Sequence, residues 1–345
     1  SIPHSKLRKW SNMKGLLQQF QATIERESLL PSGSKLILCV SGGSDSIALL
    51  HLCHQLSRLF RWQLHILHFH HGLREESDEE ARFVRNLSQR LNLEFHLRTT
   101  RDFQSETSGL QEKARNWRRA EALKLREEIR ADSILTAHHA EDQLETWLLK
   151  WLRGAHLSGL QGMSRSDPPF IRPLLDFRKE VLSDFLKENG FEWREDASNQ
   201  DSKYMRNRVR NELLPLLRTL SREGIESRIR DLDNQSRLLQ KELESQYQNW
   251  LEKTGPVSEL PISVIESESE FLQQEILVRF ITGKTGIALS YFQLRNLFEL
   301  LKKSKKQWEM HLEGSWVITL KNNKLQCVEQ NTSSHKTSIE NEDSD

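Results

Sequence analysis

The chain has 345 residues, with 50 lysines and arginines against 49 aspartates and glutamates, which leaves a formal net charge of +1 at pH 7. This length favours two domains. No apolar run approaches the ~18 residues of a membrane-spanning helix, so we expect no membrane partner. The three cysteines are odd in number and widely spaced, so we expect no disulfide scaffold. The basic N-terminus lacks the apolar core of a secretory signal, and we expect a cytoplasmic chain.

The first half of the chain alternates short apolar runs with longer amphipathic ones. Strands are predicted at residues 36–40, 64–70, 94–98 and 133–137, and helices at residues 47–60, 77–91, 111–130 and 141–153. The first run, LILCV, has no polar face, which is typical of a strand that is buried on both sides. The alternation predicts an α/β fold, with a Rossmann-like parallel sheet covered by helices.

The second half predicts a mostly helical domain that ends in a β-hairpin. Helices are expected at residues 178–189, 205–217 and 225–253, and strands at 307–312 and 315–320. We expect a basic N-terminal extension (1–20), an α/β domain (21–217), a helical domain (218–328) and a disordered acidic tail (329–345). The tail holds five acids and one base, so its net charge is −4 and the rest of the chain carries +5.

The most informative motif lies between the first buried strand and the helix that follows it. It consists of Ser41, Gly42, Gly43, Ser44, Asp45 and Ser46. Glycines let backbone N–H groups turn toward an anion, and a helix N-terminus adds a positive dipole, so the motif predicts a phosphate site. Asp45 would repel phosphate unless a cation lay between them, which makes it a candidate Mg²⁺ ligand. A tight turn with a capping side chain is the plain alternative.

This S-G-G-x-D-S loop resembles that of the PP-loop ATP pyrophosphatases, which split ATP between its α and β phosphates. The loop is not a Walker motif, since no Lys-Ser/Thr pair closes it. A second Walker-like sequence, Gly-Lys-Thr, occurs at residues 283–285. The Walker motif requires a glycine at position 278, where this chain has valine, and no buried strand precedes the sequence. We therefore exclude it as the phosphate site.

Two histidine-rich stretches follow the second and fourth predicted strands. Residues 68–74, HFHHGLR, suggest either a polar strand end or a metal site whose further ligands the spacing does not supply. Residues 138–146, HHAEDQLET, place Asp142 and Glu145 three positions apart on one helix face. Acids in a first turn also favour the helix dipole, but the two histidines beside them indicate a role in the active site.

Arginines mark two further segments. Ala114, Arg115 and Arg118 lie on the predicted helix 111–130, where the arginines either are solvated or reach the nucleotide. Residues 206–210, RNRVR, follow the segment WREDASN at 193–199 without a neutralising acid. An arginine run is usually a solvated helix face, but this setting favours contact with anionic RNA.

Together these motifs resemble those of the tRNA(Ile)-lysidine synthetases over roughly residues 35–217. That family combines S-G-G-x-D-S with H-x-[N/H]-H-x-L-R, H-H-x-[D/E]-D-Q-x-E-T, A-R-x-x-R, W-x-E-D-x-S-N and R-N-x-x-R, all matched here. The resemblance implies a catalytic domain at 21–217, an accessory tRNA-binding domain at 218–328, and ATP and Mg²⁺ as cofactors. It also implies that L-lysine is joined to C2 of the first anticodon cytidine of tRNA(Ile) with a CAU anticodon, through an adenylated tRNA. A homodimer is compatible with it.

The resemblance also implies residue roles. ATP would bind the loop 41–46, His71 and Arg115, with Asp45 holding Mg²⁺. Lysine would bind Asp142 and Glu145, and since its ε-amine has a pKa of about 10.4 it must lose a proton before attack, to His138 or Glu145. The candidate tRNA contacts are Asn199, Arg206, Asn207, Arg208 and Arg210.

Two alternative functions remain open from the sequence. One is a tRNA thiolase that uses the same adenylation; it would need a nucleophilic cysteine or a C-x-x-C site, and neither is visible. The other is a non-catalytic tRNA-binding protein with a vestigial loop.

Overall fold

The computed structural model describes residues 4–70, 76–100, 110–156, 159–194, 205–221, 224–303 and 307–330. Two compact units make up the chain: Ser1–Thr146 with Gly162–Leu220, and Trp147–Gln161 with Ser221–Asp345. Among the described residues no helix combines the length and the apolar character that crossing a bilayer requires. His71 and Asn199, two of the expected site residues, and residues 331–345 of the expected tail lie outside the described residues.

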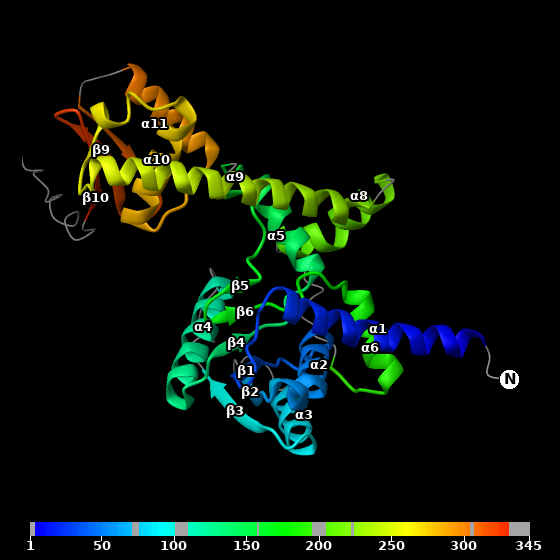
Figure 1. Ribbon diagram of the computed structural model, residues 1–345. Coiled ribbons are helices and arrows are strands. Elements are labelled where there is room, and N and C mark those ends of the chain that lie inside the picture. Colours follow the sequence, from blue (N-terminus) through cyan, green and yellow to red (C-terminus); the bar gives the residue numbers. More distant parts are fainter. Residues whose placement is uncertain are drawn as a thin grey trace, which may run out of the picture. The chain divides into compact units, whose positions relative to one another are not determined.

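The first unit is built on a six-stranded sheet with strand order β3-β2-β1-β4-β6-β5 (Figure 1). All pairings are parallel except that of β5 with β6. The strands are β1 (Lys35–Cys39), β2 (Gln63–His70), β3 (Glu94–Thr99), β4 (Ser133–Leu135), β5 (Ser166–Asp167) and β6 (Phe170–Ile171). The expected α/β fold with a parallel sheet is confirmed. The two-residue strands β5 and β6 were not expected, because so short a run shows no periodicity.

Helices cover both faces of this sheet because residues along a buried strand alternate between the faces. Leu36 and Leu38 of β1 pack in one cluster with side chains of α1 (His4–Arg26), α2 (Ser44–Phe60), α3 (Glu76–Arg90) and α6 (Lys179–Asn189). Ile37 packs in another cluster with Ala122 and Leu125 of α4 (Leu110–Ile129). The other helices are α5 (Ala140–Leu152), which begins in this unit and whose residues from Trp147 on belong to the second unit, α7 (Met205–Arg208) and α8 (Leu214–Leu220).

Two expected boundaries fall within helices. Leu16, Phe20 and Ile24 of α1, spaced four residues apart, are buried in the core of the first unit, so the helix runs through the boundary expected at residue 20. The helix expected at 205–217 is interrupted by a π-helical turn, Val209–Leu213, and the boundary expected at residue 217 lies inside α8.

The second unit has its own core between helices and a four-stranded antiparallel sheet of order β7-β10-β9-β8. Its elements are α9 (Ile225–Thr254), β7 (Leu260–Pro261), a 3-10 turn (Ile262–Val264), α10 (Glu270–Thr285), α11 (Tyr291–Lys303), β8 (Trp308–His311), β9 (Trp316–Lys321) and β10 (Lys324–Glu329). The expected hairpin is β8 and β9, but the sheet is larger than expected. Asn322 and Asn323, with φ angles of 52° and 62°, form the tight turn into the unexpected strand β10.

Candidate active site

The site forms where two neighbouring parallel strands end. The loop after β1 and the segment after β4 meet at the same edge of the sheet, since β1 and β4 are paired in parallel. The chain order of the strands reverses at this pair, and such a switch point leaves a crevice in which ligands bind in open α/β sheets.

The loop after β1 is held by its own serines. The Ser46 hydroxyl donates to the Gly43 carbonyl at 2.9 Å and accepts from the Gly42 N–H at 3.2 Å, while Ser41 Oγ accepts from the Gly43 N–H at 3.3 Å. Gly42 has a φ of +101°, a conformation that residues with a Cβ rarely adopt. α2 begins at Ser44 and opens with backbone N–H groups that have no partner within the helix, so the loop is shaped to bind an anion.

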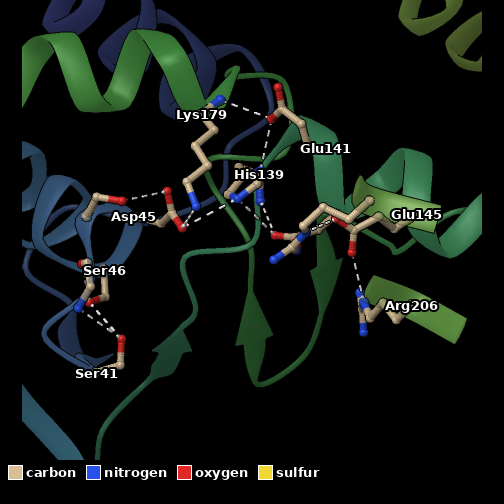
Figure 2. Close-up of polar contacts among 12 residues, drawn as sticks. Ser41, Asp45, Ser46, His139, Glu141, Glu145, Lys179 and Arg206 are labelled. Carbon is tan, nitrogen blue, oxygen red and sulfur yellow. Dashed lines mark hydrogen bonds and ion pairs between the residues drawn. The ribbon is translucent and has the colours of Figure 1, made fainter. Parts of the chain in front are cut away.

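His139 lies at the centre of the site, among three carboxylates (Figure 2). Its Nε2 is 3.5 Å from Oδ2 of Asp45 and 3.6 Å from Oδ2 of Asp142, and its Nδ1 is 3.0 Å from Oε2 of Glu141. Burial by itself would lower the pKa of His139, but the hydrogen bonds to Asp45 and Glu141 and the charge of Asp142 outweigh it and raise the pKa to about 10. The imidazole is therefore a cation at pH 7. The sequence places His139 in an active-site motif, but it did not indicate a separate chemical role for this residue.

Asp45 joins the phosphate loop to this cluster. Its Oδ2 also lies 3.8 Å from Nζ of Lys179, at the start of α6 (Figure 2). Burial alone would raise the pKa of Asp45, but the hydrogen bond and charge of His139 and the charge of Lys179 lower it. The result is an ionised carboxylate beside the helix start, a quarter exposed, which is the kind of ligand that Mg²⁺ prefers. Lys179 was not expected from the sequence, since it lies far from every motif.

The acids on α5 are paired with arginines from the segment that contains the π-helical turn. Glu145 is fully buried; its Oε2 accepts from Nε of Arg206 at 2.9 Å, and its Oε1 accepts from Nε of Arg210. Arg210 also donates to Oδ1 of Asp142 at 3.2 Å. From the sequence we expect the acids to bind lysine and the arginines to contact tRNA. In the structure the two groups instead bind each other.

The remaining expected residues have different surroundings. Arg208, the last residue of α7, pairs with Glu212 of the π-helical turn, and both side chains are more than half exposed. Asn207 lies on α7 between the two arginines that reach Glu145. Of the histidines near the end of β2, His68 is buried with its Nδ1 2.8 Å from the Val40 carbonyl, and His70 pairs with Asp78, so their partners are not those of a shared metal site.

His138 differs from its neighbour in charge. Its Nδ1 lies 2.9 Å from the Thr136 hydroxyl. Burial lowers the pKa of His138 to about 4; the charge of Asp142 opposes this shift, and those of nearby arginines, among them Arg115, reinforce it. The two adjacent histidines that follow β4 therefore differ in charge at pH 7: His138 is neutral and His139 is a cation.

A cavity of about 530 Å³ opens beside the cluster, within the size range of small-ligand sites. It is lined by both acids and bases, among them His139, Glu141, Lys179, Glu180, Asp184 and Arg210. Such a mixed lining suits a ligand that carries both an ammonium and a carboxylate, or a ligand with phosphates.

Residues 13–217 match the family described as PP-loop domain. The tRNA(Ile)-lysidine synthase of Synechococcus sp. (strain PCC 6301) is 32% identical over 85% of this chain and 89% of its own length. That of Enterococcus faecalis is 31% identical over 86% of this chain but only 66% of its own length, so the chain spans just under two thirds of that relative.

A solved structure shares the fold. The U34-tRNA thiolase NcsA from Methanococcus maripaludis, determined with its 4Fe-4S cluster, has a TM-score of 0.57, with 14% identity over 68% of this chain and 80% of that one. At this identity the likeness concerns the fold alone.

Proposed function

Because the chain belongs to the tRNA(Ile)-lysidine synthase family of PP-loop proteins, we propose that it joins L-lysine to a tRNA(Ile) with a CAU anticodon at the expense of ATP. The C2 oxygen of the first anticodon cytidine attacks the α-phosphate of ATP, and pyrophosphate leaves. The lysine ε-amine then attacks C2, and AMP leaves with the oxygen. The product is lysidine, which pairs with A rather than G.

The observation that carries this proposal is the position of Asp45 and His139. They connect the loop that is shaped for phosphates to the acid cluster of the motif 138–146, at one edge of one sheet. Mg²⁺ on Asp45 would neutralise charge as pyrophosphate departs. Cationic His139 and Lys179 would orient the phosphates and hold Asp45 in place.

The lysine site needs an exchange of partners. We assign the ε-ammonium to Asp142 and Glu145, whose oxygens are bound by Arg206 and Arg210 in this structure. An ammonium that enters there must displace a guanidinium. The phosphates of the tRNA are the anions that would take up the released arginines, which reconciles the two roles expected for this segment.

The proton of the ammonium needs an acceptor. Glu145 is already bound by two guanidinium groups, whereas His138 holds an unprotonated imidazole next to Asp142. We therefore assign proton acceptance to His138. Because the pKa of His138 is low, it holds the proton only transiently and passes it to solvent, and the free amine then attacks C2.

The cysteines argue against a thiolase. Cys39, Cys53 and Cys327 are the only cysteines of the chain, and none is bonded to another. Burial raises the pKa of Cys39 to about 12 and that of Cys327 to about 11, and raises that of Cys53 further, so all three are protonated and poor nucleophiles at pH 7.

The proposal is tested by following two products in one assay. The protein is incubated with ATP, Mg²⁺, radiolabelled lysine and either tRNA(Ile) or tRNA(Met), both with CAU anticodons. We expect pyrophosphate and labelled tRNA with tRNA(Ile), and neither product in quantity with tRNA(Met). A protein that binds tRNA(Ile) but leaves ATP intact in the presence of lysine would refute the proposal and favour the non-catalytic alternative.

A further inference from the structure

Three metal-ligating side chains meet at the opposite end of the sheet from the active site. They are His65, near the beginning of β2, and Glu94 and His96, at the beginning of β3. No motif drew attention to them, because the two strands lie about thirty residues apart in the sequence. In the part of the chain that the structure describes, this is the one such group of histidine, cysteine or carboxylate side chains.

The backbone fixes all three side chains on one face of the sheet. His65 is the direct partner of Glu94 in the parallel pairing of β2 with β3. Glu94 and His96 are two residues apart on β3, so they point to the same side. The group therefore rests on two paired strands rather than on a loop, as a precise binding site requires.

The distances between the three potential ligand atoms suit a small divalent cation. His65 Nδ1 is 3.2 Å from His96 Nε2 and 3.3 Å from Glu94 Oε2, and His96 Nε2 is 3.9 Å from the same oxygen. A tetrahedral zinc ion with ligands at about 2.0–2.2 Å holds those ligands roughly 3.3–3.5 Å apart. A tetrahedral ion just above the plane of this triangle, with water as its fourth ligand, would need only small side-chain adjustments.

We propose that His65, Glu94 and His96 form a binding site for a divalent transition metal such as Zn²⁺, which ties the edge strand β3 to β2. Two imidazoles and a carboxylate are ligands that zinc accepts, with water in a fourth position. The side chain of Glu94 is 73% exposed, whereas those of the histidines are largely buried, so the cation enters from the Glu94 side. The site is structural: among the described strands, β3 lies at the edge of the sheet and pairs only with β2.

The test is a Zn²⁺ titration of the full chain by calorimetry, in excess Mg²⁺ to occupy sites that prefer oxygen ligands. Wild type is compared with Glu94→Gln, with His96→Gln, and with His311→Gln, which removes an exposed histidine from β8 in the other unit. We expect one tight site in wild type and in His311→Gln, and at least a tenfold loss of Zn²⁺ affinity in the two ligand variants. Zn²⁺ should also raise the melting temperature of wild type but not of Glu94→Gln.

Co²⁺ provides a second readout, because a tetrahedral site gives it visible absorption bands that an octahedral aqueous ion shows only weakly. These bands should appear with wild type and be lost in Glu94→Gln. Zn²⁺ isotherms that are the same in wild type and Glu94→Gln would place the metal elsewhere and overturn the proposal, as would the absence of a tight site. Since Glu94 is exposed, Glu94→Gln should fold, and its melting temperature in EDTA checks this.

Discussion

Nε2 of His139 lies 3.5 Å from Oδ2 of Asp45, so the last residue before α5 is in ionic contact with the first turn of α2. This contact joins two segments almost a hundred residues apart in the sequence. It also gives the site a fixed positive charge next to the phosphate loop.

The charge of His139 makes stability depend on pH. Its pKa is raised from 6.5 to about 10 in the folded chain, so its contribution to stability is complete below pH 6.5 and is lost as the pH rises toward 10. We expect the free energy of unfolding to fall by up to about 1.4 kcal/mol per pH unit in that window. Denaturant unfolding at pH 7, 8 and 9 measures the slope, which should be shallower in His139→Gln. Equal slopes in the two proteins would contradict the ion pairs.

Replacing Asp45 by asparagine removes one charge at almost constant volume. We expect pyrophosphate formation to fall at least about 100-fold, because the divalent cation loses its ligand and His139 and Lys179 lose their anion. Binding of tRNA should change little. Asp231→Asn, which alters an exposed carboxylate on α9, is the control and should retain its pyrophosphate formation. Normal turnover in Asp45→Asn would rule out the metal role.

His138→Gln separates the two chemical steps. Glutamine removes the imidazole that we assign as the proton acceptor for lysine, but leaves the phosphate loop intact. Pyrophosphate should still be released with tRNA(Ile), while lysidine formation falls at least about 100-fold, a typical loss for a general base. Adenylated tRNA should then accumulate and be detectable by mass spectrometry. Parallel loss of both products would instead assign His138 to nucleotide binding.

Two arginines of one short segment should behave differently. Arg210→Ala leaves the buried carboxylate of Glu145 with Arg206 alone, and should destabilise the fold by about 1–3 kcal/mol. Arg208→Ala breaks an exposed pair with Glu212, and should cost less than about 0.5 kcal/mol. Unfolding free energies test this difference. The salt dependence of tRNA binding should weaken in Arg208→Ala, and an unchanged slope would exclude a phosphate contact.

Phe20→Ala tests whether the N-terminal helix belongs to the core. Phe20 is fully buried among side chains of the first unit, and the loss of such a ring costs about 3–5 kcal/mol. Leu59→Ala, at a position that is 61% exposed, should be nearly neutral. Guanidinium unfolding of both variants gives the comparison. Similar midpoints would show that α1 is a detachable extension.

The parallel sheet and the phosphate loop were predictable because their signals are local. A continuous apolar run followed by glycines and serines defines β1 and its loop without knowledge of the rest of the chain. The pair Asn322-Asn323 is also a local signal, for the turn into β10. In the strand itself, KLQCVE, the alternation of apolar and polar residues is too weak to predict a strand.

The partners within the site were not predictable, because they depend on contacts between distant segments. Arg206 is 61 residues from Glu145, and the stretch 203–210 around it contains no acid, so the sequence suggested an RNA contact. The difference between His138 and His139 is likewise invisible in the sequence. It depends on which charged groups surround each imidazole: mainly arginines near His138 and three carboxylates near His139.

The burial of Glu145 has a consequence for synthesis on the ribosome. The phosphate loop, the histidines and Glu145 are all translated before Arg206 and Arg210, which neutralise that carboxylate. Until residue 210 has left the ribosome, the Glu145 carboxylate lacks the two guanidinium groups that neutralise it in the folded chain, so it is costly to bury. Folding of the first unit is therefore expected to reach its final stability only late in translation, after the arginines have emerged from the exit tunnel.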